Sequence, residues 1–177
     1  MQYRCSLYLV GLVVIFVLTT IGCMKESSEY DHQVNAFDKE FIANARYLHS
    51  VSNRTSTLVP DRSQDGMLHA FAAASDSLHT IASLGIDSVA NFININVPLS
   101  VNSEIELKAK MLNDLSGRKF DSAYIAVQRD YYLLAVELYS LEQDKGSNAS
   151  LRNFARSKLP LFQQRLQNAN SLLKQFQ

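Results

Sequence analysis

FDSAYIAVQRDYYLLAVELYSL, residues 120–141, is the stretch that decides the fold class of this chain. Its large apolar side chains recur at intervals of three and four residues: Phe120, Tyr124, Val127, Tyr131, Leu134, Leu138 and Leu141. Because an α-helix turns once in about 3.6 residues, this spacing places them along one stripe of a helix. A helix with one long apolar stripe needs other elements to cover it.

Three further segments have the same spacing. Their stripes are Phe37, Phe41, Ala45 and Leu48; Leu68, Phe71, Ser75, Leu78 and Ala82; and Leu151, Ala155, Leu159, Phe162, Leu166, Ala169, Leu173 and Phe176. Four stripes that each need a partner predict an all-α fold, with an antiparallel four-helix bundle as its simplest form.

Start and stop signals divide the four helices. Ser103 and Glu106 form a capping-box pattern, which predicts that a short additional helix begins there. The turn DKGSN at 144–148 separates the third helix from the fourth. Gly85 is expected to end the second helix. Residues 86–102 lack a helical period, so we expect them to form a long crossover between the second and third helices.

The first 22 residues have the features of an export signal. Arg4 precedes the apolar stretch 7–21, which is too short for a typical transmembrane helix and suits a signal peptide. The stretch ends in TIGC at 20–23, which resembles the bacterial lipobox. The resemblance implies that Cys23 is acylated and that residues 1–22 are removed. The alternative is an uncleaved N-terminal anchor.

This interpretation divides the chain into a signal peptide at 1–22, a flexible tether at 23–35 and a helical bundle domain at 36–177. Position 24 is Met, so the aspartate that usually retains lipoproteins in the inner membrane is absent, and we expect an outer membrane lipoprotein on either the periplasmic or the surface face. The two cysteines are Cys5, which leaves with the signal, and Cys23. The mature chain would have no free thiol, which argues against cysteine nucleophiles and thiolate metal sites.

The charge balance gives no indication of a polyanionic partner. The chain has 17 basic and 17 acidic side chains and a formal net charge of zero. Nucleic-acid binding domains usually carry a basic surface. We therefore expect no nucleic-acid partner, and the expected partners are the membrane, through the lipid anchor, and an envelope protein.

Two motifs resemble those of a known family. LSGRKFDSAY at 115–124 is similar to its Leu-Ser-Gly, Phe-Asp, Tyr signature, and Phe154-Ala155 followed by Leu159-Pro160 is similar to its closing signature. The family is domain of unknown function 4142, a group of bacterial predicted outer membrane proteins. The resemblance implies a ferritin-like helical bundle.

Members of that family carry three histidines, and this sequence resembles a divergent member that lacks them. At the corresponding positions it has Phe71, Tyr131 and Arg165. Phe71 and Tyr131 lie on the apolar stripes described above. The resemblance therefore implies an aromatic core in place of a polar or metal-binding interior, with no metal and no cofactor.

The histidines of this chain give no metal-binding pattern. Glu29 and His32 have the Glu-x-x-His spacing of ferritin-like sites, but they precede the bundle and have no second copy. His69 and His79 are ten residues apart in one helix, so they point to different faces. We expect both, and also the isolated His49, to lie at the surface or at the boundary of the core.

One charged pair is expected inside the bundle. Asp130 lies beside the stripe of the third helix, and Arg165 lies in the fourth. We predict that they form a structural ion pair, whose main effect would be to fix the helix register.

No catalytic constellation is present in the sequence. It has neither a glycine-rich phosphate loop nor a recognisable nucleophile elbow. We therefore expect no enzymatic activity and a non-enzymatic interaction or structural module of the cell envelope. The first alternative is a metal- or small-ligand-binding ferritin-like bundle involved in envelope stress, which rests on fold analogy. A periplasmic stress or redox enzyme is a further alternative.

Overall fold

The computed structural model describes residues 33–99 and 101–176. The predicted signal peptide, Cys23 and the Glu29–His32 spacing lie outside these residues. Among the helices that are described, none is both long enough and apolar enough to cross a bilayer.

Helices make up most of the described part of the chain, and no strand occurs in it. The elements are α2 (Ala36–Ser56), α3 (Val59–Arg62), α4 (Gly66–Phe92), α5 (Ser103–Met111), α6 (Gly117–Lys145) and α7 (Ala149–Phe176). The all-α prediction is confirmed. The four long helices α2, α4, α6 and α7 coincide with the four segments of helical spacing.

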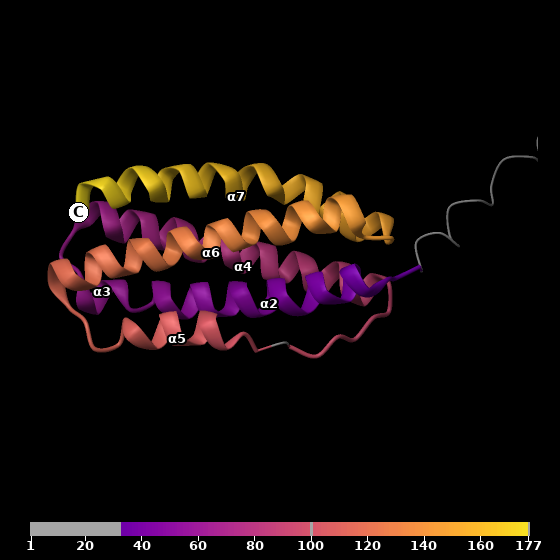
Figure 1. The fold of residues 1–177 in the computed structure, drawn as a ribbon, viewed down its shortest axis with the longest axis horizontal. Coiled ribbons are helices and arrows are strands. Elements are labelled where there is room, and N and C mark those ends of the chain that lie inside the picture. The colour runs from indigo at the N-terminus through magenta and orange to yellow at the C-terminus, as the bar shows by residue number, and fades with distance from the viewer. Residues whose placement is uncertain (1–32, 100, 177) are drawn as a thin grey trace, which may run out of the picture. The chain divides into compact units, whose positions relative to one another are not determined.

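The long helices pack along one another in pairs (Figure 1). α2 packs against α4 and α6, and α7 packs against α6 and α4. Following the colours in Figure 1, α2 and α7 run in one direction, and α4 and α6 run in the other. Because α4 and α6 are parallel, the chain between them must return along the whole length of the helices. The described residues among 93–116, which include α5, make this return.

The second helix is longer than predicted. α4 continues past Gly85 to Phe92, so the crossover begins at 93 and not at 86. Gly85 instead permits close helix packing, because a Cβ atom at this position would collide with the ring of Phe154 in α7. Asn94, in the left-handed conformation with φ 55°, ends the helix.

The crossover helix starts where expected but has a different cap. The side chain of Asn102 accepts hydrogen bonds from the backbone of Glu104 (3.0 Å) and Ile105 (3.2 Å). Ser103 is therefore the first helical residue and not the cap. Glu106 binds side chains of α2 and does not close a capping box.

The core follows a slightly different line along α6 from the one predicted. The first part of the stripe, from Phe120 to Tyr131, is buried, but Leu141 is 42% exposed. Tyr132, Ala135 and Tyr139 fill the core farther along α6. The predicted stripe repeats every 3.5 residues, and a straight helix drifts by about 20° per heptad relative to that repeat. The predicted positions therefore rotate away from the core toward the end of α6.

Candidate functional site

Two histidines meet in the centre of the described bundle. The Nδ1 atom of His49 in α2 lies 2.7 Å from the Nδ1 atom of His79 in α4. Both side chains are fully buried. The prediction that these two histidines lie at the surface or boundary was wrong. His69 is only partly buried, and its Nε2 atom bonds to the carbonyl oxygen of Ser63.

A tyrosine extends this pair into a chain of three side chains, the His–Tyr chain (Tyr139, His49 and His79). The Tyr139 hydroxyl lies 2.8 Å from Nε2 of His49. Nε2 of His79, at the other end, is buried and has no hydrogen-bond partner among the described residues.

The arrangement favours one direction for the hydrogen bonds. If the Tyr139 hydroxyl donates to His49, then His49 Nδ1–H donates to His79, and only the Nε2–H donor of His79 is left without a partner. In the reverse direction, both the hydroxyl proton of Tyr139 and the Nε2 lone pair of His79 would lack partners. Unpaired buried polar groups are costly, so the first direction is favoured.

Aromatic rings close around the two imidazoles. Phe162 of α7 stacks on His49, with ring centroids 5.6 Å apart and planes inclined by 10°. Tyr132 of α6 stacks on His79 at 5.3 Å and 26°. The ring of Tyr139 lies 4.7 Å from that of Phe162. All four long helices therefore contribute to the surroundings of the His–Tyr chain.

This apolar enclosure keeps both imidazoles neutral. Burial lowers the pKa of His49 to about 3. Burial also lowers the pKa of His79 well below its usual value, and the electrostatic interactions with His49 and Arg165 lower it further. Burial raises the pKa of Tyr139 well above the usual value of a phenol. The chain is thus a set of neutral groups joined by hydrogen bonds.

Further polar pairs lie beside the His–Tyr chain in the core. Each joins a side chain of α6 to α2 or α4: Tyr132 to Ser75 (2.6 Å), Gln128 to Ser52 (2.9 Å) and Thr55 (2.9 Å), and Tyr124 to Ser56 (2.9 Å). The interior therefore combines aromatic packing with paired polar groups.

The residues assigned to the family-histidine positions have different surroundings. Phe71 is buried and packs edge-on against the rings of Tyr124 and Tyr132. Tyr131 is buried, and its hydroxyl donates to the carbonyl oxygen of Ile105 in the crossover helix at 3.0 Å. These two aromatic side chains are part of the core, as the sequence predicted.

Arg165 does not form the predicted ion pair. Asp130 instead binds Lys108 of α5 (2.8 Å) and its neighbour Arg129 (2.5 Å). Asp130 pairs with Lys108 because the crossover brings α5 onto the side of α6 that carries Asp130. Arg165 is partly buried and has no hydrogen bond or ion pair within the described residues.

A pair of buried carboxyl groups lies where α2 begins and α6 ends. Asp38 accepts hydrogen bonds from the backbone of Asn35 (2.6 Å), from the Ser147 hydroxyl (2.7 Å) and from the backbone of Asn148 (3.1 Å). Glu142 is 1% exposed, and neither of its buried carboxyl oxygens has a hydrogen-bond partner among the described residues.

These surroundings shift the pKa values of the two carboxyl groups in opposite directions, so that Asp38 is charged and Glu142 is neutral. Burial, followed by the interaction with the Asp38 carboxylate, raises the pKa of Glu142 to about 9. The pKa of Asp38 is lowered: burial acts to raise it, but the hydrogen bonds that Asp38 accepts together outweigh this effect. At neutral pH Glu142 is therefore protonated, and the Asp38 carboxylate carries the charge of the pair.

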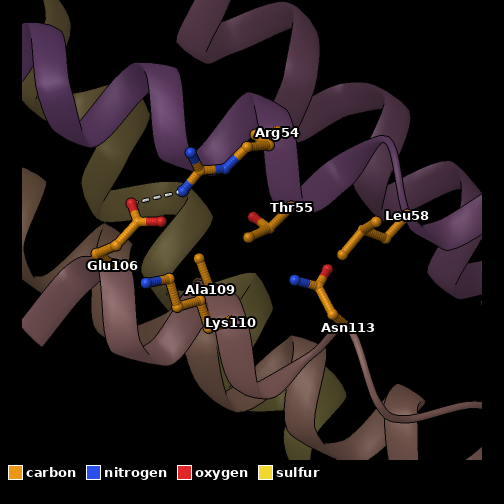
Figure 2. Close-up of a pocket in the computed structure, with 7 residues that line it drawn as sticks. All are labelled: Arg54, Thr55, Leu58, Glu106, Ala109, Lys110 and Asn113. Atoms are coloured by element: carbon orange, nitrogen blue, oxygen red, sulfur yellow. Dashed lines mark hydrogen bonds and ion pairs between the residues drawn. The ribbon is translucent and has the colours of Figure 1, made fainter.

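A surface cavity of about 230 Å³ lies between α2 and α5 (Figure 2). It is lined by Arg54, Thr55, Leu58, Glu106, Ala109, Lys110 and Asn113. At its edge Glu106 accepts hydrogen bonds from Arg54 (2.7 Å) and Tyr47 (2.8 Å). These bonds hold the crossover helix against α2, and the Arg54–Glu106 pair lies at the edge of the cavity.

Within the described residues, no group of three histidine, cysteine or acidic side chains is placed to hold a metal ion. The His–Tyr chain consists of two imidazoles and one phenol joined by hydrogen bonds, and its His79 end presents one N–H donor.

Sequence reasoning missed the His–Tyr chain because His49 and His79 are 30 residues apart. One signal was available, since His79 continues the spacing of Leu68, Phe71, Ser75 and Ala82.

The comparisons agree with a helical domain. A family model described as "Domain of unknown function (DUF4142)" matches residues 23–172. The crystal structure of protein DUF305 from Streptomyces coelicolor, described as a secreted protein, is similar with a TM-score of 0.68 and 13% sequence identity. The match covers 79% of this chain and 92% of that chain, and at this identity it concerns the fold alone. No curated protein matches the sequence.

Proposed function

The chain belongs to the family "Domain of unknown function (DUF4142)", and from that premise we propose that it is a lipid-anchored helical domain of the bacterial envelope that acts as a non-enzymatic interaction module. Its anchor is Cys23, and its expected location is the outer membrane. The fold shared with a protein described as secreted supports a place outside the cytoplasm.

The observation that carries this proposal is the contrast between the interior and the crossover. The His–Tyr chain is fully buried, so a substrate could not reach it without a rearrangement of the bundle. In contrast, five large apolar side chains between residues 92 and 111 are 59–72% exposed: Phe92, Leu99, Val101, Leu107 and Met111. Single exposed apolar residues are common, but a series of them along one connection is typical of a binding surface.

The proposed lipid anchor is tested by identifying the N-terminal residue of the mature chain and its modification. We expect the chain made in bacteria to fractionate with membranes and to begin with an acylated Cys23. Cys23→Ala should abolish acylation and cleavage, as mass spectrometry of the N-terminal peptide would reveal. A mature N-terminus elsewhere, or the same mass shift in Cys23→Ala, would contradict the anchor.

The interaction surface is tested by site-specific crosslinking in cells. A photo-crosslinking amino acid is placed at Leu107 in α5, and at Leu161 in α7 as a control of comparable apolar character. We expect a discrete crosslinked product from position 107 that is lost when Met111→Lys is added, and none from position 161. Equal products from both positions would contradict the proposed surface.

An alternative function is a metal- or small-ligand-binding ferritin-like bundle involved in envelope stress. Two observations favour it: the imidazoles of His49 and His79 lie side by side, and α4 and α6 run parallel with a long return, as in ferritin-like connections. Elemental mass spectrometry and calorimetry with iron, zinc and manganese test it. Stoichiometric binding that is lost in His79→Gln would place this alternative first.

A further inference from the structure

An exposed heptad pattern runs along the outside of α4. Its positions alternate in steps of three and four residues over three heptads, and we call them the α4 seam: Met67, Ala70, Ala74, Ser77, Ile81, Leu84 and Ser88. The large members Met67, Ile81 and Leu84 are 54%, 54% and 63% exposed. A repeat of this length places the side chains on one line of the helix and is typical of the line along which two helices pack together.

The α4 seam carries no charged residue. A surface helix normally turns its apolar side chains to the core and charged ones to water, and the residues that α4 contributes to the core lie on the side opposite the seam. The two acidic residues of α4 lie toward α2: Asp87 binds Arg46 at 2.6 Å, and Asp76 lines a cavity beside Ser56. The seam is therefore a neutral, largely apolar line that no other described part of the chain covers.

The side-chain sizes along the α4 seam are complementary to the same seam in reverse. About a two-fold axis at Ser77, each large side chain of one copy lies opposite a small one of the other, which allows close packing of the two helices. In a parallel pair, large side chains would meet large ones and small would meet small. The antiparallel pairs are Met67 with Ser88, Ala70 with Leu84, Ala74 with Ile81, and Ser77 with its own copy.

We propose that two copies of this chain associate through the α4 seam, with their α4 helices antiparallel about a two-fold axis at Ser77. A second copy fits the seam because the seam has no charge with which to select a different partner and because its sizes match its own reverse. A lipid surface favours large apolar side chains throughout, whereas four of the seven seam positions are Ala or Ser. This inference concerns α4 and depends on neither the exposed crossover residues nor the lipid anchor.

The size of the α4 seam predicts a weak dimer. Residues 67–88 extend over about 33 Å of a helix that is about 10 Å wide, so the seam covers about 330 Å² on each copy. Stable complexes cover about 800 Å² on each partner. Because α2 and α7 both pack against α4, their outer edges lie beside the seam and add to the contact. We expect a dissociation constant of about 1–100 μM, so that monomer and dimer coexist in dilute solution.

Cysteine crosslinking in cells tests the arrangement on the full-length chain. In the proposed dimer the two Ser77 residues face each other, whereas the two Ser88 residues lie about 33 Å apart along the helix axes. We expect Ser77→Cys to form a disulfide-linked dimer on oxidation and Ser88→Cys to form none. Coexpressed Met67→Cys and Ser88→Cys chains should form a mixed dimer. The unmodified chain, oxidised in parallel, accounts for any disulfide of Cys5 or Cys23.

A size exchange tests the register, measured by analytical ultracentrifugation of the full-length chain in a mild detergent. Ala70→Leu should weaken self-association at least about tenfold, because the new side chain meets Leu84 of the other copy, and adding Leu84→Ala should restore it. Both positions are exposed, so the fold is retained, as circular dichroism would verify. Leu141→Lys, which changes an exposed leucine of α6, is the control and should leave self-association unchanged.

Three results would overturn the proposal. They are a chain that remains monomeric throughout the titration, equal crosslinking of Ser77→Cys and Ser88→Cys, and no recovery of the dimer when Leu84→Ala is added to Ala70→Leu. A monomeric chain that sediments with phosphatidylcholine vesicles, and loses this binding in Ile81→Lys, would assign the α4 seam to a lipid surface instead.

Discussion

Replacing Glu142 by glutamine should remove a loss of stability that the unmodified domain undergoes as the pH rises. The pKa of Glu142 is raised from 4.5 to about 9 in the folded chain. Between these values the unfolded chain releases the proton and the folded chain keeps it. The contribution of the neutral carboxyl is therefore complete below pH 4.5 and is lost as the pH rises toward 9.

The size of the effect follows from the width of this window. Each pH unit inside it corresponds to at most about 1.4 kcal/mol of unfolding free energy. Glu142→Gln keeps the size of the side chain and, like the protonated acid, is neutral, but it has no proton to lose. We expect it to be more stable than the unmodified chain by about 3 kcal/mol at pH 7 and by up to about 6 kcal/mol at pH 9.

Urea unfolding followed by circular dichroism at a series of pH values from 5 to 9 measures this difference. Because both chains contain the same buried histidines, their titration cancels in the difference between the two unfolding free energies. Glu137→Gln, which removes an exposed carboxylate from the same helix, is the matched control and should show no such trend. A difference between Glu142→Gln and the unmodified chain that does not change with pH would refute the reasoning.

Three further predictions concern packing, capping and acid sensitivity. Gly85→Ala should lower the unfolding free energy by about 1–3 kcal/mol, because the new methyl group collides with Phe154; an unchanged thermal midpoint would contradict this. Asn102→Ala should lower the unfolding free energy by about 1 kcal/mol through loss of the cap, and Ser103→Ala should lower it clearly less in the same urea titration. A larger loss for Ser103→Ala than for Asn102→Ala would contradict the assignment of Asn102 as the cap. Because burial lowers the pKa of His49 to about 3, the unfolded chain alone takes up this proton between pH 6.5 and 3. On acidification through this window His49 alone should lower the unfolding free energy by up to about 1.4 kcal/mol per pH unit, and His49→Gln should reduce the slope accordingly.

The helical architecture was largely available from the sequence. Apolar spacing identified all four long helices, and the turn at 144–148 separates α6 from α7 as expected. These features depend on neighbours along the chain. The end of α4 was misplaced because Gly85 was interpreted locally as a helix stop. Its actual role depends on Phe154, which lies 69 residues away on another helix.

The candidate site was much less predictable for the same reason. Each histidine alone matches a boundary residue, and only the packing of α2 against α4 brings His49 and His79 together. The partner of Asp130 is Lys108, which lies in the crossover, and no periodic pattern shows where a crossover will lie. Sequence spacing therefore determined the helices, whereas pairing across them required the three-dimensional arrangement.

The polar pairs between α6 and its neighbours have a consequence for how this sequence can change over evolutionary time. Sliding α6 by one helical turn, about 5.4 Å, would separate Tyr132 from Ser75 and Tyr124 from Ser56 at once. Each hydroxyl would then face apolar side chains without a partner. A substitution at one member of a pair is therefore tolerated best when the other member changes too. Among relatives with this arrangement, Tyr132 and Ser75 should be exchanged together, for example for phenylalanine and alanine, more often than either is exchanged alone.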